Sequence, residues 1–491
     1  MNTITAGKLS VLEKVGYSLG DLAANLIFQT LMTFLAFFYT DVYQIPAAQA
    51  STIIFAGGMV GALFTPLMGV LADRTHTRWG KFRPWILWTS VPFGAVTLLA
   101  FSTPDLAPGG KLVYAFVTYV LLVVIYCANN LPYASLSGVL TGSMSERNSL
   151  SSYRFVAVMI AQFIIQALLL PLVLLFGDGD KAVGFERVMT LFALVGMIFL
   201  LITFAVTRER IVPSPEQRSS IFEDVGDLLK NRPWIIMLVL TVLVFVTLAL
   251  KGGMYVYYFE NYLDTSQIVD FLDSVGFNGA IHALNSTLQG MGLSGFQWPE
   301  DPTTSAFSLF NAGGILMMIV GIGLSRPLAD RFGKRDVFGF ALFVSTLFIL
   351  AFYFLSPQAI ALVFIAQILH GFFYGITIPL LWAMIADVAD YSEWKNGRRA
   401  TAIIFSAMII GLKVGLSVGG ALVAGILALY GYDAQLPVQN ADAVNGIRLS
   451  ISVYAALPFL FGIALLFAYE INKKLEFRIE SDLGLRRGAA A

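Results

Sequence analysis

Three ionisable side chains stand inside long apolar stretches of the sequence, namely Asp21, Lys251 and Lys413. A charged group in hydrocarbon is costly unless it is paired, so each is a candidate functional residue. Lys413 follows Arg399 by about 14 residues, roughly 21 Å of helix, which places it near the middle of a bilayer. Because this depth exceeds the reach of a snorkelling side chain, Lys413 is predicted to serve a substrate or coupling site.

Lys251 and Asp21 each allow two interpretations. Lys251 lies nearer the end of its apolar stretch, and it either snorkels to the interface or contacts substrate. Asp21 is either the counter-charge of Lys413 or a tie that holds its helix near one membrane surface. Asp21 is also the candidate proton carrier, because a desolvated carboxylate can bind a proton in one conformation and release it in another.

Neutral polar residues accompany these charges. The amides of Asn25 and Asn130 can donate to and accept from sugar hydroxyls, although bonding between helices is an alternative role. Asn129 is a further polar residue within a predicted span. His370 is an imidazole within an apolar stretch, where it could join a proton path or pack as a hydrogen-bonded core residue. Aromatic rings that could stack on a sugar, or simply pack between helices, are Tyr126, Tyr133, Tyr255 and Trp382.

The sequence does not indicate an enzyme. The histidines, His76, His282 and His370, are too scattered to build a metal site, and no nucleophile–base set or phosphate-binding glycine loop is evident. The single cysteine, Cys127, excludes a disulfide framework or a cysteine metal site. We expect no metal and no organic cofactor, and a proton is the one coupling species that the residues suggest.

Long apolar helices must position these residues. The 491 residues are 57% hydrophobic and 13% charged, whereas soluble proteins are about a quarter charged. A helix needs roughly 20 apolar residues to cross a bilayer, and only helices satisfy their own backbone there at this length. We predict an all-α integral membrane protein with twelve transmembrane helices. Their approximate ranges are 16–42, 47–72, 84–103, 112–140, 153–176, 188–207, 233–262, 305–326, 336–356, 358–388, 400–431 and 449–472.

The basic residues fix the expected orientation. Lys and Arg concentrate in the N-terminal segment, in every second loop and in the C-terminal tail. This asymmetry predicts a multi-pass protein of the cytoplasmic (inner) membrane with both termini in the cytoplasm. The basic residues outside the spans that fall on the opposite side are Lys111, Lys181, Arg187 and Arg448.

An internal repeat divides the chain into two halves. The order Ala-Gly-Gly, apolar helix, Leu-Ala-Asp-Arg, Gly-Lys begins at Ala56 and again at Ala312, about half the chain apart. Two parallel six-helix halves with a midplane substrate site between them are the plan of the major facilitator superfamily. We expect an N-terminal half 1–207, a cytoplasmic linker 208–232, a C-terminal half 233–472 and a cytoplasmic tail 473–491. Residues 263–304 form an extracytoplasmic insertion with helical periodicity, whose role the sequence does not name.

Several motifs resemble those of the glycoside–pentoside–hexuronide:cation symporters, the melibiose permease family. They are "FFYTDVY", "DRTHTRWGKFRPW", "NNLPYASLSGVLTGSMSERNSLSSYR" and "MIADVADYSEWKNGRRATAIIFSAMIIGLKVG". The resemblance covers essentially all the spans in order, and it implies the superfamily fold, sugar substrates and alternating access. It also implies two opposite-charge gating clusters at the cytoplasmic ends of the halves, suited to latching one conformation. Their members are Asp73, Arg74, Arg78, Lys81 and Arg83, and Asp387, Asp390, Tyr391, Glu393, Lys395 and Arg399.

The resemblance extends to the substrate site, with one departure. Arg154 corresponds to an arginine of the family's sugar region, and Lys413 falls on the family's functional lysine. Family members that hold sugar with two carboxylates place them where this chain has Asn25 and Asn130. Amides still bind sugar hydroxyls, so a carbohydrate remains the expected substrate. The candidate substrate residues are Asn25, Asn130, Tyr126, Arg154, Lys251, Trp382 and Lys413; the candidate coupling residues are Asp21, Lys413 and His370.

A second departure concerns the coupling cation. Sodium-coupled relatives carry an acid, an Asn and an Asp shortly before a proline, and this chain has Gly61, Phe64 and Thr65 before Pro66. Cys127 replaces the hydroxyl that completes the family's cation site. Hard cations prefer oxygen ligands, and of these side chains only Thr65 offers one. We therefore predict no sodium site of the family type.

The sequence thus predicts a secondary active transporter of a sugar or glycoside, proton-coupled rather than sodium-coupled. Alternatives are an uncoupled facilitator, in which Lys413 permanently supplies the cation's charge, and a lysolipid or amphiphile carrier of the same fold. Lys251 and Lys413 could also pair with the carboxylate of a uronic acid. The expected partners are a small carbohydrate and membrane lipid, with no nucleic acid, and the expected state is a monomer.

Overall fold

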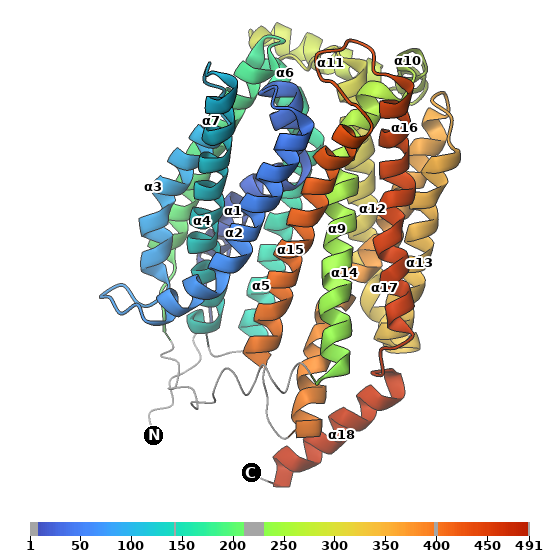
Figure 1. The fold of residues 1–491 in the computed structure, drawn as a ribbon. Coiled ribbons are helices and arrows are strands. Elements are labelled where there is room, and N and C mark those ends of the chain that lie inside the picture. Colours follow the sequence, from blue (N-terminus) through green and yellow to red (C-terminus); the bar gives the residue numbers. More distant parts are fainter. Residues whose placement is uncertain (1–7, 142–143, 211–229, 397–400, 490–491) are drawn as a thin grey trace.

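The computed structural model describes residues 8–141, 144–210, 230–396 and 401–489. These residues form a bundle of long helices, with no strand among those described. Helix α18 lies across one end of the bundle, which we call the terminal face, and α10 and α11 lie at the opposite end, the loop face (Figure 1).

The helices begin where a side chain can cap them. Ser10, Asp180, Asn231 and Asp301 each accept a hydrogen bond from a backbone N–H of the first turn that follows. Such caps satisfy donors that the helix itself leaves free. The helices of the N-terminal half are α1 (Val11–Phe37, extended by a π turn, Phe38–Val42), α2 (Ala47–Asp73), α3 (Arg83–Ala100), α4 (Pro108–Leu140), α5 (Met144–Phe163), a π turn (Ile164–Leu168), α6 (Leu169–Gly177) and α7 (Lys181–Val206).

The C-terminal half repeats this arrangement of long helices on the other side of the bundle. Its members are α9 (Arg232–Asn261), α12 (Pro302–Phe332), α13 (Lys334–Ala351), α14 (Ile360–Asn396), α15 (Thr401–Leu429), α16 (Ala441–Leu449), a π turn (Ser450–Tyr454) and α17 (Ala455–Leu466), followed by α18 (Lys473–Ala489).

Eleven helices in the described part of the chain are long and apolar enough to cross a membrane. They match the predicted spans except 84–103, which corresponds to α3. This helix has 18 residues and packs against α4 and α7. Its outward side chains are apolar, including the exposed Trp88 and Val91, so α3 presents an oily surface although it falls outside the eleven.

The insertion 263–304 is helical, as its periodicity predicts. It contains α10 (Thr265–Ser274), α11 (Phe277–Gly290) and a 3₁₀ turn (Ser294–Phe296). Asp264 caps α10 through Ser266 N, and the side chain of Asn285 bonds both the N–H and the carbonyl of Trp298. The insertion therefore folds back on itself at the loop face.

Close helix approach within the C-terminal half depends on glycine. A Cβ added to Gly371 of α14 would lie 2.5 Å from the carbonyl oxygen of Gly314 of α12. Small residues of this kind let two helix backbones pack in direct contact in a membrane. They fix the position of His370, one residue before Gly371, beside α12.

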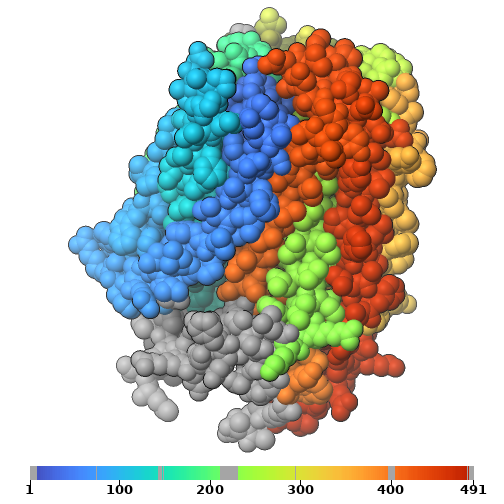
Figure 2. All heavy atoms as spheres, viewed as in Figure 1, coloured from blue at the N-terminus to red at the C-terminus, as the bar shows by residue number. Residues whose placement is uncertain are grey.

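The two halves join mainly along α2 and α15, which touch over the face seen in Figure 2. Helix α1 also packs against α9, and α12 packs against the π turn between α5 and α6. All of these contacts pair one half with the other, so the space between the halves is where a substrate site is expected.

Candidate functional site

The two halves enclose a central cavity of about 170 Å³. Its walls come from α1, α5 and the π turn after α5 on one side, and from α9, α12 and α14 on the other. No Asp or Glu stands among the described residues that line it. The polar side chains of the lining are Gln29, Thr33, Gln162, Gln166, Lys251, Tyr255, Asn311, Gln367, His370 and Tyr374.

A pair of basic side chains forms part of the C-terminal wall. Lys251 of α9 and His370 of α14 are 6% and 2% exposed, and Nζ of Lys251 is in hydrogen-bond contact with Nε2 of His370. Nδ1 of His370 lies 2.8 Å from Oγ and 3.2 Å from the carbonyl oxygen of Ser345. A carbonyl only accepts, so Nδ1 carries the proton and Nε2 accepts from the Lys251 ammonium. Lys251 therefore does not snorkel, and His370 is its hydrogen-bond partner.

Amides fill much of the remaining wall. Gln367 Oε1 accepts a 2.8 Å bond from the hydroxyl of Tyr255. Gln29 Oε1 and Thr33 Oγ1 are buried with no hydrogen-bond partner in the described part of the protein. Buried polar atoms normally have partners, so these two atoms are available to a ligand.

Asp21 pairs with Arg154, not with Lys413. Nε of Arg154 on α5 donates a 2.7 Å bond to Oδ2 of Asp21 on α1. The guanidinium also lies over the rings of Tyr17 and Tyr133, at 5.7 and 5.4 Å from their centroids. These rings stack at 4.5 Å. The pairing of Asp21 with Lys413 is thus not formed, because a nearer cation stands on the adjacent helix of the same half.

The predicted amide pair takes up different surroundings. Nδ2 of Asn25 donates to the carbonyl oxygen of Asp21 at 2.9 Å, which ties Asn25 to the same helix turn. Asn130 is half-buried and makes no side-chain hydrogen bond within the described residues. The neighbouring Asn129 bonds Thr89 of α3 at 2.7 Å, so it joins helices of one half.

Of the four predicted aromatic residues, Tyr255 lines the cavity, whereas Tyr126, Tyr133 and Trp382 lie outside its lining. Tyr126 stacks on the cavity residue Phe28 with ring centroids 5.8 Å apart, so it backs the wall. Trp382 of α14 is half-buried and packs against the hydrophobic core of the protein. Of the residues predicted for substrate or coupling, Lys251 and His370 line the cavity directly.

The Lys413 ammonium lies beside Thr65 and Cys127, two of the positions where sodium-coupled relatives are expected to carry cation ligands. Its Nζ donates to Oγ1 of Thr65 at 2.6 Å and lies 3.0 Å from Sγ of Cys127. Thr65 Oγ1 in turn donates to the carbonyl oxygen of Gly61 at 2.8 Å. Phe64 is half-buried against the core, and a Cβ at Gly61 would overlap the side chain of Val123. The ammonium therefore sits among the predicted missing cation-site positions on α2 and α4.

The first predicted gating cluster is held within its own half. The carboxylate of Glu209 accepts from the backbone N–H groups of Lys81, Phe82 and Arg83 at 2.7–2.9 Å. The guanidinium of Arg83 donates to the carbonyl oxygen of Phe204 at 2.7 Å. Arg78 lies over the ring of Trp79, and Arg74 is exposed. Asp73 ends α2, and its side chain lies outside the described part.

The second predicted cluster connects α14 to the C-terminal helix. Asp387 accepts from Lys334 at 2.7 Å, and Lys334 also pairs with Glu476 of α18 at 2.8 Å. The hydroxyl of Tyr391 donates to Glu470, and Lys395 donates to Tyr391. Asp390 and Glu393 belong to the same helix end and have interactions of their own. Arg399 lies outside the described residues.

A group of hydrogen bonds at the loop face joins the two halves, and the sequence analysis missed it. Thr40 bonds Tyr257 at 2.6 Å, Tyr432 donates to Asp41 at 2.6 Å, and Lys181 pairs with Glu260 at 2.7 Å. We call these six residues the loop-face latch. Burial, with the nearby charge of Asp41, raises the pKa of Tyr432, so this hydroxyl keeps its proton and donates it.

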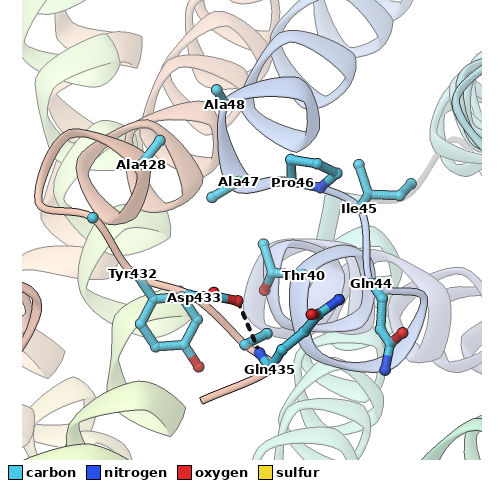
Figure 3. Close-up of a pocket in the computed structure, with 12 residues that line it drawn as sticks. Thr40, Gln44, Ile45, Pro46, Ala47, Ala48, Ala428, Tyr432, Asp433 and Gln435 are labelled. Carbon is cyan, nitrogen blue, oxygen red and sulfur yellow. Dashed lines mark hydrogen bonds between the residues drawn. The ribbon is translucent and has the colours of Figure 1, made fainter. Parts of the chain in front are cut away.

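A second pocket, of about 390 Å³, lies beside the latch. It opens between the α1–α2 connection and the segment after α15, with Thr40 and Tyr432 in its wall (Figure 3). Asp433 accepts a 3.0 Å bond from the backbone of Gln435 there. The pocket therefore lies at the loop face, against bonds that join the two halves.

Hydrogen bonds between the halves are confined to part of the bundle. Among the described residues they are those of the latch, the bond from Ser51 to the carbonyl of Ala421, and those of Lys413. None lies at the terminal face within the described ranges. The described residues therefore join the two halves by hydrogen bonds at the loop face.

A simple sequence signal would have found much of the cavity. Asn25, Gln29 and Thr33 recur every four residues on α1, and Gln162 and Gln166 repeat this spacing. Residues four apart share one helix face. A stripe of polar side chains on an otherwise apolar helix predicts that this face of the helix lines a polar cavity. The basic pair carries no such signal, because Lys251 and His370 are distant in sequence.

Comparison with known proteins identifies similar chains. The family model described as MFS/sugar transport protein matches residues 16–289 and 301–473. The inner membrane symporter YicJ of Escherichia coli is 34% identical, over 92% of this chain and 90% of that protein. The putative glycoside/cation symporter YagG of the same organism is 32% identical, over 96% and 94%. The isoprimeverose transporter of Lactiplantibacillus pentosus is 31% identical, over 96% and 91%.

Solved structures share the fold at low sequence identity. The nucleoside transporter NupG matches with a TM-score of 0.56 and 13% identity, over 94% of this chain and 100% of that one. The peptide transporter POT in complex with sulfate matches with a TM-score of 0.61 and 11% identity, over 95% and 97%. Both support the helical transporter architecture alone.

Proposed function

The chain belongs to the MFS/sugar transport family, and we propose that it carries a sugar or glycoside across the inner membrane by alternating access without sodium. The resemblance to the glycoside–pentoside–hexuronide symporters is confirmed by relatives at 31–34% identity. This is a family of transporters, not of enzymes. The polar lining of the cavity supports a sugar over a lysolipid, since amides and tyrosines suit hydroxyl groups.

One observation carries the sodium independence, namely the contacts of Lys413. Its ammonium bonds Thr65 and Cys127 at the junction of α2, α4 and α15. In this arrangement a fixed cation already stands where a sodium ion would need oxygen ligands and negative charge. A second cation there would be repelled by the first, and Thr65 is the one side chain among Gly61, Phe64, Thr65 and Cys127 that offers an oxygen ligand.

Alternating access follows from how the halves are joined. Opening the loop face requires the bonds of the latch to break, while new contacts form at the terminal face. We place the terminal face in the cytoplasm, on the distribution of Lys and Arg. The cavity between the halves would then face the cytoplasm in this conformation and the outside in the other.

We propose the proton as coupling ion and Asp21 as its carrier. The carboxylate is 5% exposed as a residue and bonded to Arg154. Because Arg154 donates a hydrogen bond to this carboxylate, proton uptake by Asp21 requires a conformation in which the two side chains separate. A second candidate, uncoupled diffusion of sugar, is favoured by the permanent charge of Lys413, which leaves no empty cation site to drive transport.

Counterflow and accumulation in proteoliposomes test these proposals. A panel of α- and β-glycosides, pentosides and uronides is offered with sodium or choline, with and without an inward proton gradient. We expect equal uptake in sodium and choline, accumulation under the proton gradient, and counterflow without accumulation for Asp21→Asn. The matched control is Asp273→Asn, an acid of the loop-face insertion that is remote from the cavity lining.

Each competing reading has its own signature. Accumulation that requires sodium would refute sodium independence. Accumulation by Asp21→Asn would exclude Asp21 as the carrier. If the sugar equilibrates across the membrane but accumulates under no gradient, the protein is an uncoupled facilitator. If lysolipids are transported and sugars are not, it is an amphiphile carrier.

A further inference from the structure

We propose that Lys251 and His370 form a carboxylate-binding subsite, and that the substrate is an anionic, uronic-acid type of sugar. The inference rests on the proposed sugar transport and specifies its substrate class. Its basis is the juxtaposition of a buried basic pair with an amide-lined cavity that contains no acid among its described lining residues.

The positive charge of this wall has no partner. Asp21 neutralises Arg154, and Lys413 is held by Thr65 of α2 and Cys127 of α4. Lys251 and His370 form no salt bridge with a carboxylate within the described part of the chain. A buried ammonium with only a neutral imidazole partner is unfavourable, and an incoming carboxylate would compensate it.

The pair is also positioned to present donors to a ligand. Ser345 fixes the tautomer of His370 through Nδ1, and Tyr374 stacks on the imidazole at 5.9 Å. The Lys251 ammonium has three donors, and the contact with Nε2 uses one of them. The others are free to meet carboxylate oxygens in the cavity, where charge-assisted bonds are strong.

The opposite wall fits the rest of a sugar. Gln29 Oε1 and Thr33 Oγ1, both without partners in the described structure, lie on α1 across the cavity from α9 and α14. Gln29 can accept from sugar hydroxyls, and Thr33 can donate or accept. A ligand with hydroxyls at one end and a carboxylate at the other would therefore satisfy both walls at once.

Matched sugar pairs provide the test. Purified protein in proteoliposomes is assayed by counterflow with methyl glucosides and the corresponding methyl glucuronides, and with galactosides and galacturonides, in both anomers. We expect a uronide to be favoured over its neutral partner by about 10-fold to 100-fold in kcat/KM, the range for hydrogen bonds to a charged group. Ligand-induced thermal stabilisation by the same sugars gives a readout that does not depend on transport.

Variants assign the preference to the pair. Lys251→Met should lose the 10-fold to 100-fold preference for a uronide over its neutral partner. His370→Gln retains an acceptor for the ammonium and should lose less than Lys251→Met. Lys474→Met removes an exposed lysine of α18 and should behave as the wild type.

The outcomes separate the subsite from the transport function. Neutral glycosides carried as well as uronides by the wild type would overturn the carboxylate subsite and leave sugar transport standing. A uronide preference that survives in Lys251→Met would also overturn it. Movement of no sugar at all would overturn the proposed function itself. If Lys251→Met does not fold, the wild-type ratio of uronide to neutral-glycoside uptake alone decides whether the carboxylate subsite exists.

Discussion

The ion pair between Asp21 and Arg154 predicts an asymmetric response to removal of either partner. The side chain of Asp21 is 7% exposed, whereas that of Arg154 is 28% exposed. Arg154→Met strands a carboxylate in the protein interior, which typically costs about 3–5 kcal/mol. Asp21→Asn strands a guanidinium that still reaches water and the rings of Tyr17 and Tyr133, so we expect about 1–2 kcal/mol.

Thermal unfolding of the purified protein measures the difference. At about 2.1 cal/mol/K per residue, a chain of this length has an unfolding entropy of about 1 kcal/mol/K. Arg154→Met should therefore lower Tm by about 3–5 °C and Asp21→Asn by about 1–2 °C. The double variant leaves no stranded charge, so its Tm should lie above that of Arg154→Met alone.

A surface pair supplies the control. Arg187 and Asp178 are 3.6 Å apart with side chains 56% and 89% exposed, and Asp178→Asn should change Tm by less than about 1 °C. The reasoning fails if Asp21→Asn is as damaging as Arg154→Met, or if the losses of the single variants add in the double variant. Either result would mean that the pair is not an isolated buried interaction.

Three further predictions concern the cation position, the latch and helix packing. Thr65→Asp should form an internal pair with Lys413 rather than a sodium site, so uptake rates in sodium and choline should stay within about twofold; sodium-stimulated uptake would contradict this. Asp41→Asn combined with Tyr432→Phe removes a bond of about 1 kcal/mol that joins the halves at the loop face. Labelling of Thr33→Cys by an impermeant maleimide added from that side should therefore rise about fivefold. Tyr430→Phe removes a bond within one half and should leave the labelling unchanged. Gly371→Leu would press on the Gly314 carbonyl and should lower Tm by about 1–3 °C by overpacking, while Gly279→Leu, which meets open space, should have no effect.

Sequence periodicity predicts the helices well because bilayer thickness dictates their length and hydrocarbon dictates their composition. The family motifs also locate Lys413 and the missing cation ligands, since these lie on helices whose order and register the motifs fix. The choice of ion-pair partner cannot be predicted from sequence in the same way. Whether Asp21 meets Arg154 or Lys413 depends on how helices rotate and pack, and both pairings satisfy the same sequence.

The insertion and the loop-face latch differ in the same way, because local sequence predicts the first and not the second. Local periodicity predicts that 263–304 is helical, because amphipathic patterning is a property of neighbouring residues. The latch requires Thr40 and Asp41 to reach Tyr257 and Tyr432, residues of the other half of the chain. No local pattern encodes that distance, so only the packed structure reveals that these residues join the two halves.

Three cations on the described helices, the buried Lys251 and the half-buried Arg154 and Lys413, are each compensated differently. Arg154 has a carboxylate, Lys413 has a hydroxyl and a thiol, and Lys251 has an imidazole. Only the first arrangement cancels the charge. We propose that the second stands in for a transported cation, because the ammonium cannot leave its helix and so cannot be released with the sugar. The third lines the cavity, where the proposed anionic substrate would pair with it. In such a transporter the electrostatic role of a coupling cation would be divided between a tethered lysine and the charge of the cargo.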